Sequence, residues 1–259
     1  MDREVNLDSI RADAARPYNV SPDVHAEDMI WRFISNHRNY PTVELAARYY
    51  FSDGAESARN LDAIIRRHLI RNDSDRRVSV FEFASGYGMV TRHLTQIPTQ
   101  TKVVACDIHP EAVEFIRHRL GQQAVISQHA PEEVTFDELF DVVFALSFFS
   151  HMPEATFAKW LKTLLRAVKP NGILVFTTHG LISRQYLGNV TLSDEGFWFR
   201  PSSEQADLDP NEYGSSLATP RFVINRLNDL PGASLAEFQR GFWWGHQDLY
   251  VVTRVEDIE

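Results

Sequence analysis

Five short apolar runs alternate with segments whose apolar residues recur at helical spacing, and this alternation limits the folds open to the chain. The runs read VSVFEF, KVVACD, AVISQ, FDVVFAL and GILVFTT, at residues 78–83, 102–107, 124–128, 140–146 and 172–178. They are apolar at nearly every position, which is typical of strands buried on both faces. Helices must then cover both faces of the sheet, so we predict an α/β fold with a parallel sheet.

The rest of the second half carries clear helix and turn signals. A helix is expected to begin at Pro153 and to stop at Lys169-Pro170-Asn171-Gly172, and another to run from Thr219-Pro220 to about Asn228. A final hairpin, LAEFQRG followed by HQDLYVVTRV, would make the sheet mixed. The polar and aromatic insertion at residues 181–218 is predicted to be a lid on the acceptor side, because long irregular segments often bind ligands.

The N-terminal part has a different pattern. Residues 1–20 are polar and are expected to be loosely ordered. From Ser21 to about Leu69 the apolar spacing is helical, with Ser21-Pro22 as the helix start. We therefore predict an N-terminal helical region or cap over residues 1–75 and the main domain over residues 76–259.

Composition opposes several other classes of protein. The 259 residues include one cysteine, so no intrachain disulfide or cysteine zinc cluster can form. No apolar run approaches the roughly 18 residues of a membrane helix, and the N-terminus lacks the apolar middle of a secretory signal. We expect a cytoplasmic protein without a membrane partner. The net charge of −9 opposes nucleic acid binding, and a homodimer is compatible with the sequence.

The first apolar run passes directly into a glycine turn, Ala84-Ser85-Gly86-Tyr87-Gly88. In an open α/β sheet, the first strand-to-helix turn forms part of the ligand site. Glycines at positions 86 and 88 would let the backbone approach a ligand closely. Asp107 ends the second run, and a carboxylate there can accept both ribose hydroxyls of an adenosine.

Two cofactors fit these features, and two residues discriminate between them. The dinucleotide fingerprint has glycine or alanine at its third position, where this chain has Thr91. A dinucleotide would also bring its pyrophosphate close to the negative charge of Glu82. S-adenosylmethionine has an ammonium group instead, which suits an acid near the turn. Glu82 therefore favours S-adenosylmethionine.

Residues 78–178 resemble the core of the class I S-adenosylmethionine-dependent methyltransferases. The first motif of that family, an acid followed by x-G-x-G-x-G, corresponds to Glu82 through Gly88, with Ala84 in place of the first glycine. The resemblance implies that Asp107 binds the ribose and that Ile108 lies against the adenine. It also implies a Rossmann-like, doubly wound, mixed sheet of seven strands with an antiparallel last strand.

Other family landmarks are present with departures. The family often has an acid after the third strand that binds the adenine amino group, whereas this chain has Gln128-His129-Ala130. His129, the backbone or Glu132 would make that contact. The stretch from Phe140 to His151 resembles the fourth strand of the family. The cofactor-binding residues we predict are Glu82, Ala84, Ser85, Gly86, Gly88, Asp107, Ile108, His129, Ala130 and Leu146.

Methyl transfer requires alignment of donor and nucleophile, exclusion of water and, for hydroxyl acceptors, removal of a proton. His151 follows the fourth run and His179 the fifth, so both are expected to face the ligand cleft as base or substrate contact. Helix capping or packing is the alternative for both. Trp243-Trp244 and Phe197 to Phe199 are candidate pocket walls, although aromatic residues more often pack cores. The sequence carries no usual metal signature, and we predict no metal.

The sequence favours an enzyme that transfers a methyl group from S-adenosylmethionine to an oxygen or nitrogen of a small-molecule or glycan-precursor acceptor. Two alternatives stay open on the same architecture. One is an NAD-dependent oxidoreductase, and the other is a non-catalytic cofactor-binding module.

Overall fold

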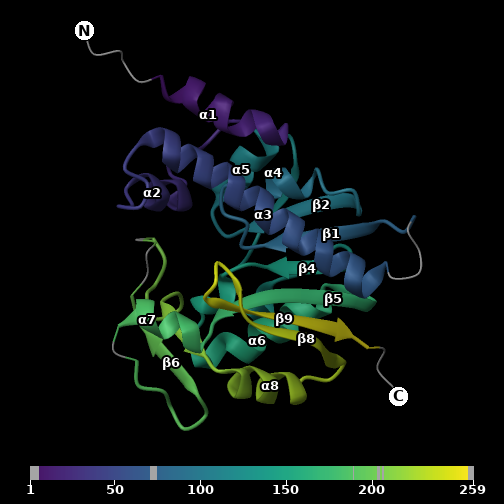
Figure 1. Ribbon diagram of the computed structural model, residues 1–259. Coiled ribbons are helices and arrows are strands. Elements are labelled where there is room, and N and C mark those ends of the chain that lie inside the picture. Colours follow the sequence, from purple (N-terminus) through teal and green to yellow (C-terminus); the bar gives the residue numbers. More distant parts are fainter. Residues whose placement is uncertain (1–5, 71–74, 189, 203–204, 206, 256–259) are drawn as a thin grey trace. The chain divides into compact units, whose positions relative to one another are not determined.

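The computed structural model describes residues 6–70, 75–188, 190–202, 205 and 207–255 (Figure 1). Its main sheet has seven strands in the order β3-β2-β1-β4-β5-β9-β8. The bounds are β1 Val78–Phe83, β2 Gln100–Asp107, β3 Gln123–Ile126, β4 Phe140–Ala145, β5 Val168–His179, β8 Ala233–Trp243 and β9 Gln247–Arg254.

Strand direction follows the sequence-based prediction. β1 pairs with β4, β2 with β3 and β4 with β5, all in parallel. The last strand, β9, is antiparallel to both β5 and β8. The predicted Rossmann-like mixed sheet of seven strands with an antiparallel last strand is therefore confirmed.

The chain divides into two compact units, and each has its own secondary structure. The first unit holds residues 1–77 and 85–127, and the second holds residues 78–84 and 128–259. The proposed division into a helical region over residues 1–75 and a main domain over residues 76–259 stays a prediction.

Among its described residues the first unit has five α-helices, of which three begin at side-chain caps. The five helices are α1 Leu7–Ala15, α2 Met29–Ser35, α3 Val43–Leu69, α4 Thr91–Leu94 and α5 Pro110–His118, with a 3-10 turn at Arg16–Tyr18. Thr42 caps α3, where its hydroxyl accepts a hydrogen bond from the Leu45 amide. The predicted apolar stripe of α3 is buried, with Leu61, Ile64 and Ile65 fully enclosed. The helical nature of this region is confirmed.

Two expectations for the N-terminus are wrong. Residues 1–20 are not loosely ordered where described, because α1 forms with Asn6 as its cap. Ser21-Pro22 does not start a helix, and residues 20–28 run without regular structure. The reason is that the buried Arg92 takes the carbonyl oxygens of Ser21 and Asp23, at 2.8 Å each, so these carbonyls cannot join a helical ladder. The next helix, α2, begins only after Asp28 caps it.

The second unit combines five strands of the main sheet with helices and a two-stranded ribbon. Its other elements are the 3-10 turns η2 Pro131–Glu133, η3 Phe148–Ser150 and η4 Leu181–Ser183, the helices α6 Glu154–Arg166, α7 Arg184–Leu187 and α8 Pro220–Asn228, and the ribbon strands β6 Phe197–Arg200 and β7 Ser215–Ala218. Thr219 caps α8 as predicted, accepting from the Phe222 amide.

The end of α6 differs from the expectation in one respect. The helix begins at Glu154, one residue after the predicted start, with Pro153 as its N-cap. The helix already ends at Arg166, and Lys169 to Gly172 lie inside β5 instead of forming a loop. Asn171 adopts a left-handed backbone there, with φ of 61°. The residues predicted to end the helix therefore form an irregular part of β5 rather than a separate turn.

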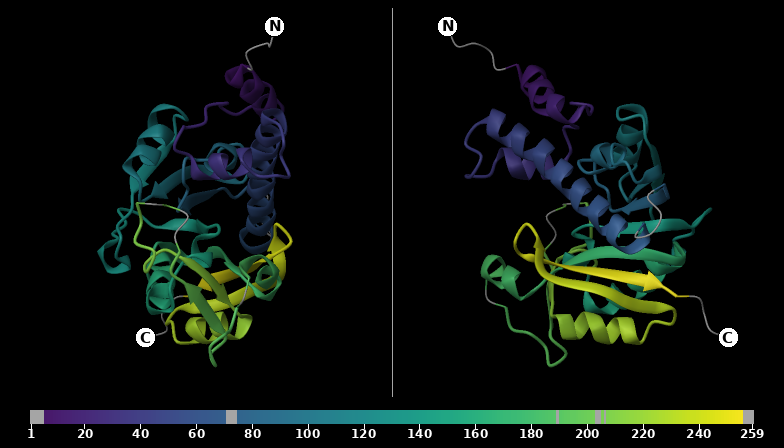
Figure 2. Two further views of the ribbon diagram at one scale, coloured as in Figure 1. Left: turned by 90° about the vertical axis from the view of Figure 1, so that its left-hand side faces the viewer. Right: turned by 45° about the vertical axis from the view of Figure 1, so that its right-hand side comes forward.

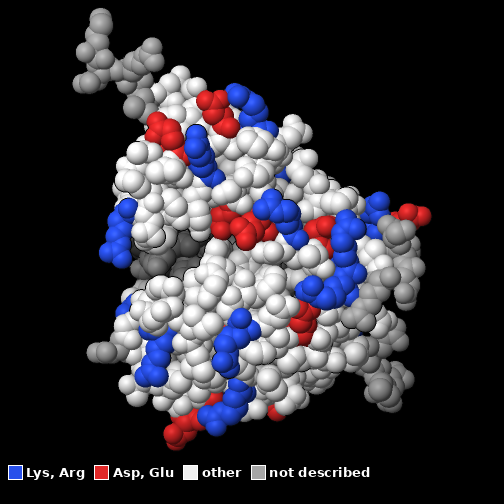
Figure 3. Space-filling model, viewed as in Figure 1, with Lys and Arg blue, Asp and Glu red and all other residues white. Residues whose placement is uncertain are grey.

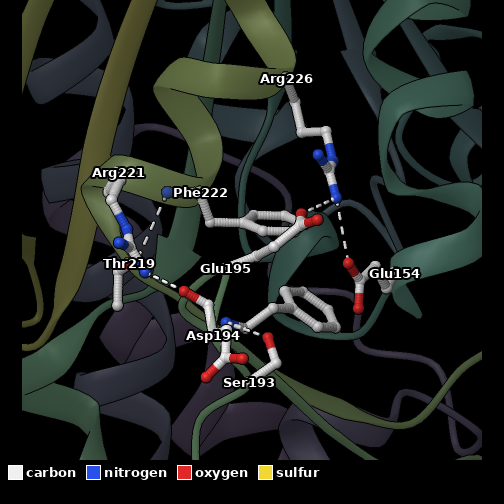
Figure 4. Close-up of polar contacts among 9 residues, drawn as sticks. Glu154, Ser193, Asp194, Glu195, Thr219, Arg221, Phe222 and Arg226 are labelled. Atoms are coloured by element: carbon white, nitrogen blue, oxygen red, sulfur yellow. Dashed lines mark hydrogen bonds and ion pairs between the residues drawn. The ribbon is translucent and has the colours of Figure 1, made fainter.

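The insertion at residues 181–218 is partly folded. The antiparallel ribbon of β6 and β7 places Phe197 against Phe222 of α8, with ring centroids 4.6 Å apart. Figure 4 shows that Arg226 of α8 pairs with Glu195 and Glu154, at 2.5 and 3.0 Å. Phe197 is thus a core residue and not a pocket wall. Whether the insertion acts as an acceptor-side lid stays a prediction.

Surface charge is mixed on the face that Figure 3 shows. Lys and Arg side chains lie in separate groups, with Asp and Glu among them. The view shows no broad area covered by basic side chains alone. Among the described residues, none of the helices has the length and apolar character needed to cross a membrane.

Candidate active site

The glycine turn after β1 has the backbone shape that the sequence implied. Gly86 and Gly88 have φ angles of 55° and 76°, in the left-handed region that favours glycine. Ala84 also adopts this conformation, with φ of 57°. It stands where the family motif has glycine, so the substitution keeps the form of the backbone at the cost of some strain.

The two glycines have different surroundings. A Cβ atom added at Gly86 would meet no atom within 4 Å, whereas one at Gly88 would lie 2.7 Å from Leu120 Cδ1. Gly86 therefore borders open space, and Gly88 allows the turn to pack against the end of α5. We expected both glycines to admit a ligand, but of the two only Gly86 borders open space.

Asp107 holds the turn from the end of β2. Its Oδ2 accepts a hydrogen bond from the Gly86 amide at 2.7 Å, and its Oδ1 accepts from the His109 amide at 3.0 Å. The His109 ring nitrogen Nδ1 lies 2.7 Å from the same Oδ1. The carboxylate is 5% exposed. The structure thus brings Asp107 to the glycine turn, and Ile108 follows half-buried, while the ribose role of Asp107 stays a prediction.

Three contacts at this turn were missed by sequence reasoning. His109 shares the carboxylate of Asp107, and Tyr87 stacks on His25 with ring centroids 4.6 Å apart and planes 9° from parallel. Phe115 of α5 meets the His25 ring edge-on. We expected His25 on a helix, but it lies in the irregular segment of residues 20–28, which we call the strap. No local pattern marks the contacts of His25, because Tyr87 and Phe115 are far from it in sequence.

We expect Asp107→Asn to weaken binding of S-adenosylhomocysteine by about 1.5–3 kcal/mol, the usual value of a hydrogen bond to a charged group. Asparagine keeps the size of the side chain and one acceptor oxygen for the turn. Titration calorimetry measures the change, with Glu111→Gln as a control for the loss of a nearby exposed carboxylate. Equal affinity in the two variants would remove Asp107 from the ribose role.

Other predicted cofactor residues lie in the second unit. Glu82 is 3% exposed in β1, opposite Phe144 of β4. Leu146 is half-buried directly after β4, and Ala130 is half-buried beyond β3. His129 is exposed. Of the alternatives for the adenine amino group, Glu132 forms an ion pair with Lys159 at 2.7 Å, which leaves it less suited to that contact than His129 or the backbone.

His151 and His179 lie together in the second unit. Their ring centroids are 6.3 Å apart, and His246 in the β8–β9 turn lies 5.9 Å from His179. Tyr213 stacks on His151 at 4.5 Å with planes 7° from parallel. The turn that carries His151 is fixed by hydrogen bonds from the Ser147 amide to Thr177 and from Gln247 to the Ser147 hydroxyl.

Burial sets the charge of this cluster. Burial, with His151 and His246 nearby, lowers the pKa of His179 to about 3, and burial also lowers the pKa of His246. His179 is therefore neutral at any physiological pH and serves as a hydrogen-bond partner more readily than as a strong base. Within the described ranges, no group of three or more His, Cys, Asp or Glu residues has a geometry that could hold a metal ion.

The parallel sheet with an antiparallel last strand, together with an open glycine turn beside a buried acid, defines the fold of the class I S-adenosylmethionine-dependent methyltransferases. Residues 81–174 match the family model for a methyltransferase domain. The chain thus carries a methyltransferase domain of this class, as the resemblance implied. The match supports a methyltransferase enzyme with S-adenosylmethionine as its cofactor.

Solved structures share this fold at low sequence identity. The amino pentose methyltransferase CalS10 from Micromonospora echinaspora has a TM-score of 0.55 at 14% identity, covering 78% of this chain and 92% of that one. The glycopeptide N-methyltransferase MtfA scores 0.55 at 16%, covering 77% and 89%. Magnesium protoporphyrin IX methyltransferase from Synechocystis PCC 6803 scores 0.55 at 14%, covering 86% and 92%. No curated protein matches this chain.

Proposed function

We propose that the protein transfers a methyl group from S-adenosylmethionine to an oxygen or nitrogen of a small-molecule or glycan-precursor acceptor. The observation that carries the proposal is the pairing of Gly86 with Asp107, where an open left-handed glycine donates its amide to a buried carboxylate at 2.7 Å. That pair offers space for a nucleoside and an acceptor for its ribose hydroxyls.

The cofactor roles follow from chemistry and position. Glu82 would attract the ammonium group of the cofactor, directly or through water, and Asp107 would accept from the ribose. Ile108 would cover the adenine, and His129 with the Ala130 backbone would reach its amino group. The remaining residues of the proposed cofactor site are Ala84, Ser85, Gly86, Gly88 and Leu146.

The acceptor roles fall to the histidines of the second unit. His151 follows β4 and η3 and stacks on Tyr213, where it can accept the proton of a hydroxyl or amine nucleophile during displacement at the sulfonium methyl. His179, held neutral, would accept a hydrogen bond from the acceptor and orient it. Solved structures with the same fold include an amino pentose methyltransferase and a glycopeptide N-methyltransferase, which supports a small-molecule or glycan-precursor acceptor.

We expect His151→Gln to lower turnover by about 100-fold, within the range of general-base contributions, while affinity for S-adenosylhomocysteine stays within about twofold. The assay uses methyl-labelled S-adenosylmethionine and a panel of hydroxylated and amino-substituted small molecules, with label transfer read by mass spectrometry. His118→Gln, at an exposed position of α5, is the matched control. Equal turnover of His151→Gln and His118→Gln would remove His151 from catalysis. No transfer to any acceptor, with cofactor bound, would favour a binding module.

The expected cytoplasmic location, a homodimer and the absence of a nucleic acid partner remain proposals. Analytical ultracentrifugation of the purified chain tests whether it forms a homodimer.

A further inference from the structure

Three histidines of the second unit come together from separate segments. His151 follows η3, His179 ends β5 and His246 lies in the turn between β8 and β9. The ring centroids of His151 and His179 lie 6.3 Å apart, and those of His179 and His246 lie 5.9 Å apart. Figures 1 and 2 show the β8–β9 turn beside α7, and a hydrogen bond from Ser183 of η4 to the His246 carbonyl, at 2.8 Å, confirms the contact.

The partners of each ring decide which nitrogen carries the proton. His151 Nδ1 lies 2.8 Å from the Gly214 carbonyl, and His179 Nδ1 lies 3.2 Å from the Ser216 carbonyl. A carbonyl oxygen can only accept, so each Nδ1 carries a hydrogen and donates it. Burial keeps His179 neutral, so its Nε2 atom has a lone pair and accepts hydrogen bonds.

Ser183 fixes His246 in the same tautomer, with the hydrogen on Nδ1. The Ser183 hydroxyl donates its hydrogen to the His246 carbonyl, so its oxygen can only accept from His246 Nδ1, which lies 3.1 Å away. Ser183 is fully buried, which holds this arrangement in place. His246 Nε2 is therefore also an acceptor, and His179 and His246 together present two acceptor nitrogens.

Aromatic rings flank the three imidazoles. Tyr213 stacks on His151, Tyr186 meets His246 edge-on at 5.1 Å and Trp244 lies 6.2 Å from it. Tyr186 is 68% exposed and Trp244 38% exposed, which is unusual for large aromatic side chains. Apolar ring faces beside a few converging polar groups are typical of small-molecule sites.

We infer that His246 joins His151 and His179 in the acceptor site, and that this cluster binds an uncharged, hydroxyl-rich acceptor such as a sugar ring. The inference rests on the proposed function. Hydroxyl groups of the acceptor donate to the Nε2 atoms of His179 and His246, while C–H faces of its ring lie on the exposed aromatic side chains. The low pKa values of His179 and His246 agree with this, because neutral imidazoles attract no anion.

The first test needs no acceptor. Two-dimensional ¹⁵N–¹H spectra of the full chain distinguish the two neutral tautomers from the imidazolium, with His118 as an exposed reference. We expect the Nδ1–H form at His151, His179 and His246 at neutral pH. An Nε2–H form or an imidazolium at His179 or His246 would overturn the inference.

The second test uses methyl β-D-glucoside and glucose 6-phosphate as matched probes, with S-adenosylhomocysteine at saturation. We expect the glucoside to shift the Nε2 signals of His179 and His246 and to bind at least about tenfold more tightly than the phosphate. His246→Phe should lower glucoside affinity by about tenfold, the equivalent of one lost hydrogen bond, with partial rescue in His246→Gln and no change in His118→Phe.

The two proposals fail differently in this design. If the proposed function is wrong, the unaltered chain will not bind S-adenosylhomocysteine. If S-adenosylhomocysteine binds and the glucoside fails to shift the histidine signals, or if glucose 6-phosphate binds more tightly, the inference about the acceptor is wrong and the methyltransferase proposal stands.

Discussion

Gly86→Val is expected to lower the affinity for S-adenosylhomocysteine by at least about 100-fold, which corresponds to about 2.7 kcal/mol. The substitution puts two methyl groups into the open space beside Asp107, where the proposed cofactor site has room for the nucleoside. The left-handed backbone at φ of 55° adds a cost of about 1–2 kcal/mol in folding free energy. Titration calorimetry measures affinity, and chemical denaturation measures folding.

Gly121→Val separates these two effects. Gly121 has φ of 65°, and a Cβ atom there would also meet no atom within 4 Å, so the backbone cost is the same. We expect a similar loss of stability in both variants, with affinity for S-adenosylhomocysteine retained in Gly121→Val alone. If both variants bound equally well, the assignment of the glycine turn to the cofactor site would be wrong.

Arg92→Met is expected to lower the free energy of unfolding by about 3–5 kcal/mol. Arg92 is 3% exposed and donates to three backbone carbonyls, those of Gly88, Ser21 and Asp23, at 3.0, 2.8 and 2.8 Å. Methionine keeps the length of the side chain but supplies no donor, so the carbonyls of the strap would lose their partners. Urea denaturation followed by circular dichroism measures the change.

Arg119→Met is the control for charge at the same segment. Arg119 forms a surface ion pair with the Asp23 carboxylate at 3.1 Å, with 62% of its side chain exposed. Surface pairs contribute about 0–1 kcal/mol, so little change is expected. A loss in Arg92→Met as small as the loss in Arg119→Met would mean that Arg92 does not hold the strap. We further expect Arg92→Met to weaken binding of S-adenosylhomocysteine, because Gly88 belongs to the cofactor turn.

The sequence predicted those elements whose determinants are local. Strands β1 and β4 were correctly bounded to within a residue because their apolar runs are continuous. Helix α8 was placed by Thr219, whose hydroxyl accepts from the Phe222 amide, a contact that spans three residues. Signals of this kind involve neighbours in the chain and can be read directly.

The missed features depend on partners far apart in the chain. Arg92 holds the strap by donating hydrogen bonds to carbonyls 71 and 69 residues away in sequence. No local pattern predicts contacts between such distant residues. The short helix α1 depends on Asn6 as its cap within a polar segment, so it lacks an apolar stripe to mark it. The orientation of His246 is set by Ser183, 63 residues earlier, so no local pattern marks this histidine as a site residue.

The most direct test of the central claim compares the thermal midpoint of the protein with S-adenosylhomocysteine and with NAD at matched, saturating concentrations. A ligand at about 100 times its dissociation constant stabilises the folded state by roughly 2.7 kcal/mol, which raises the midpoint of a chain of this size by several degrees. We predict a rise with S-adenosylhomocysteine and none with NAD. A rise with NAD alone, or no rise with S-adenosylhomocysteine, would contradict the assignment of Glu82, Gly86 and Asp107 to a methyl-donor site.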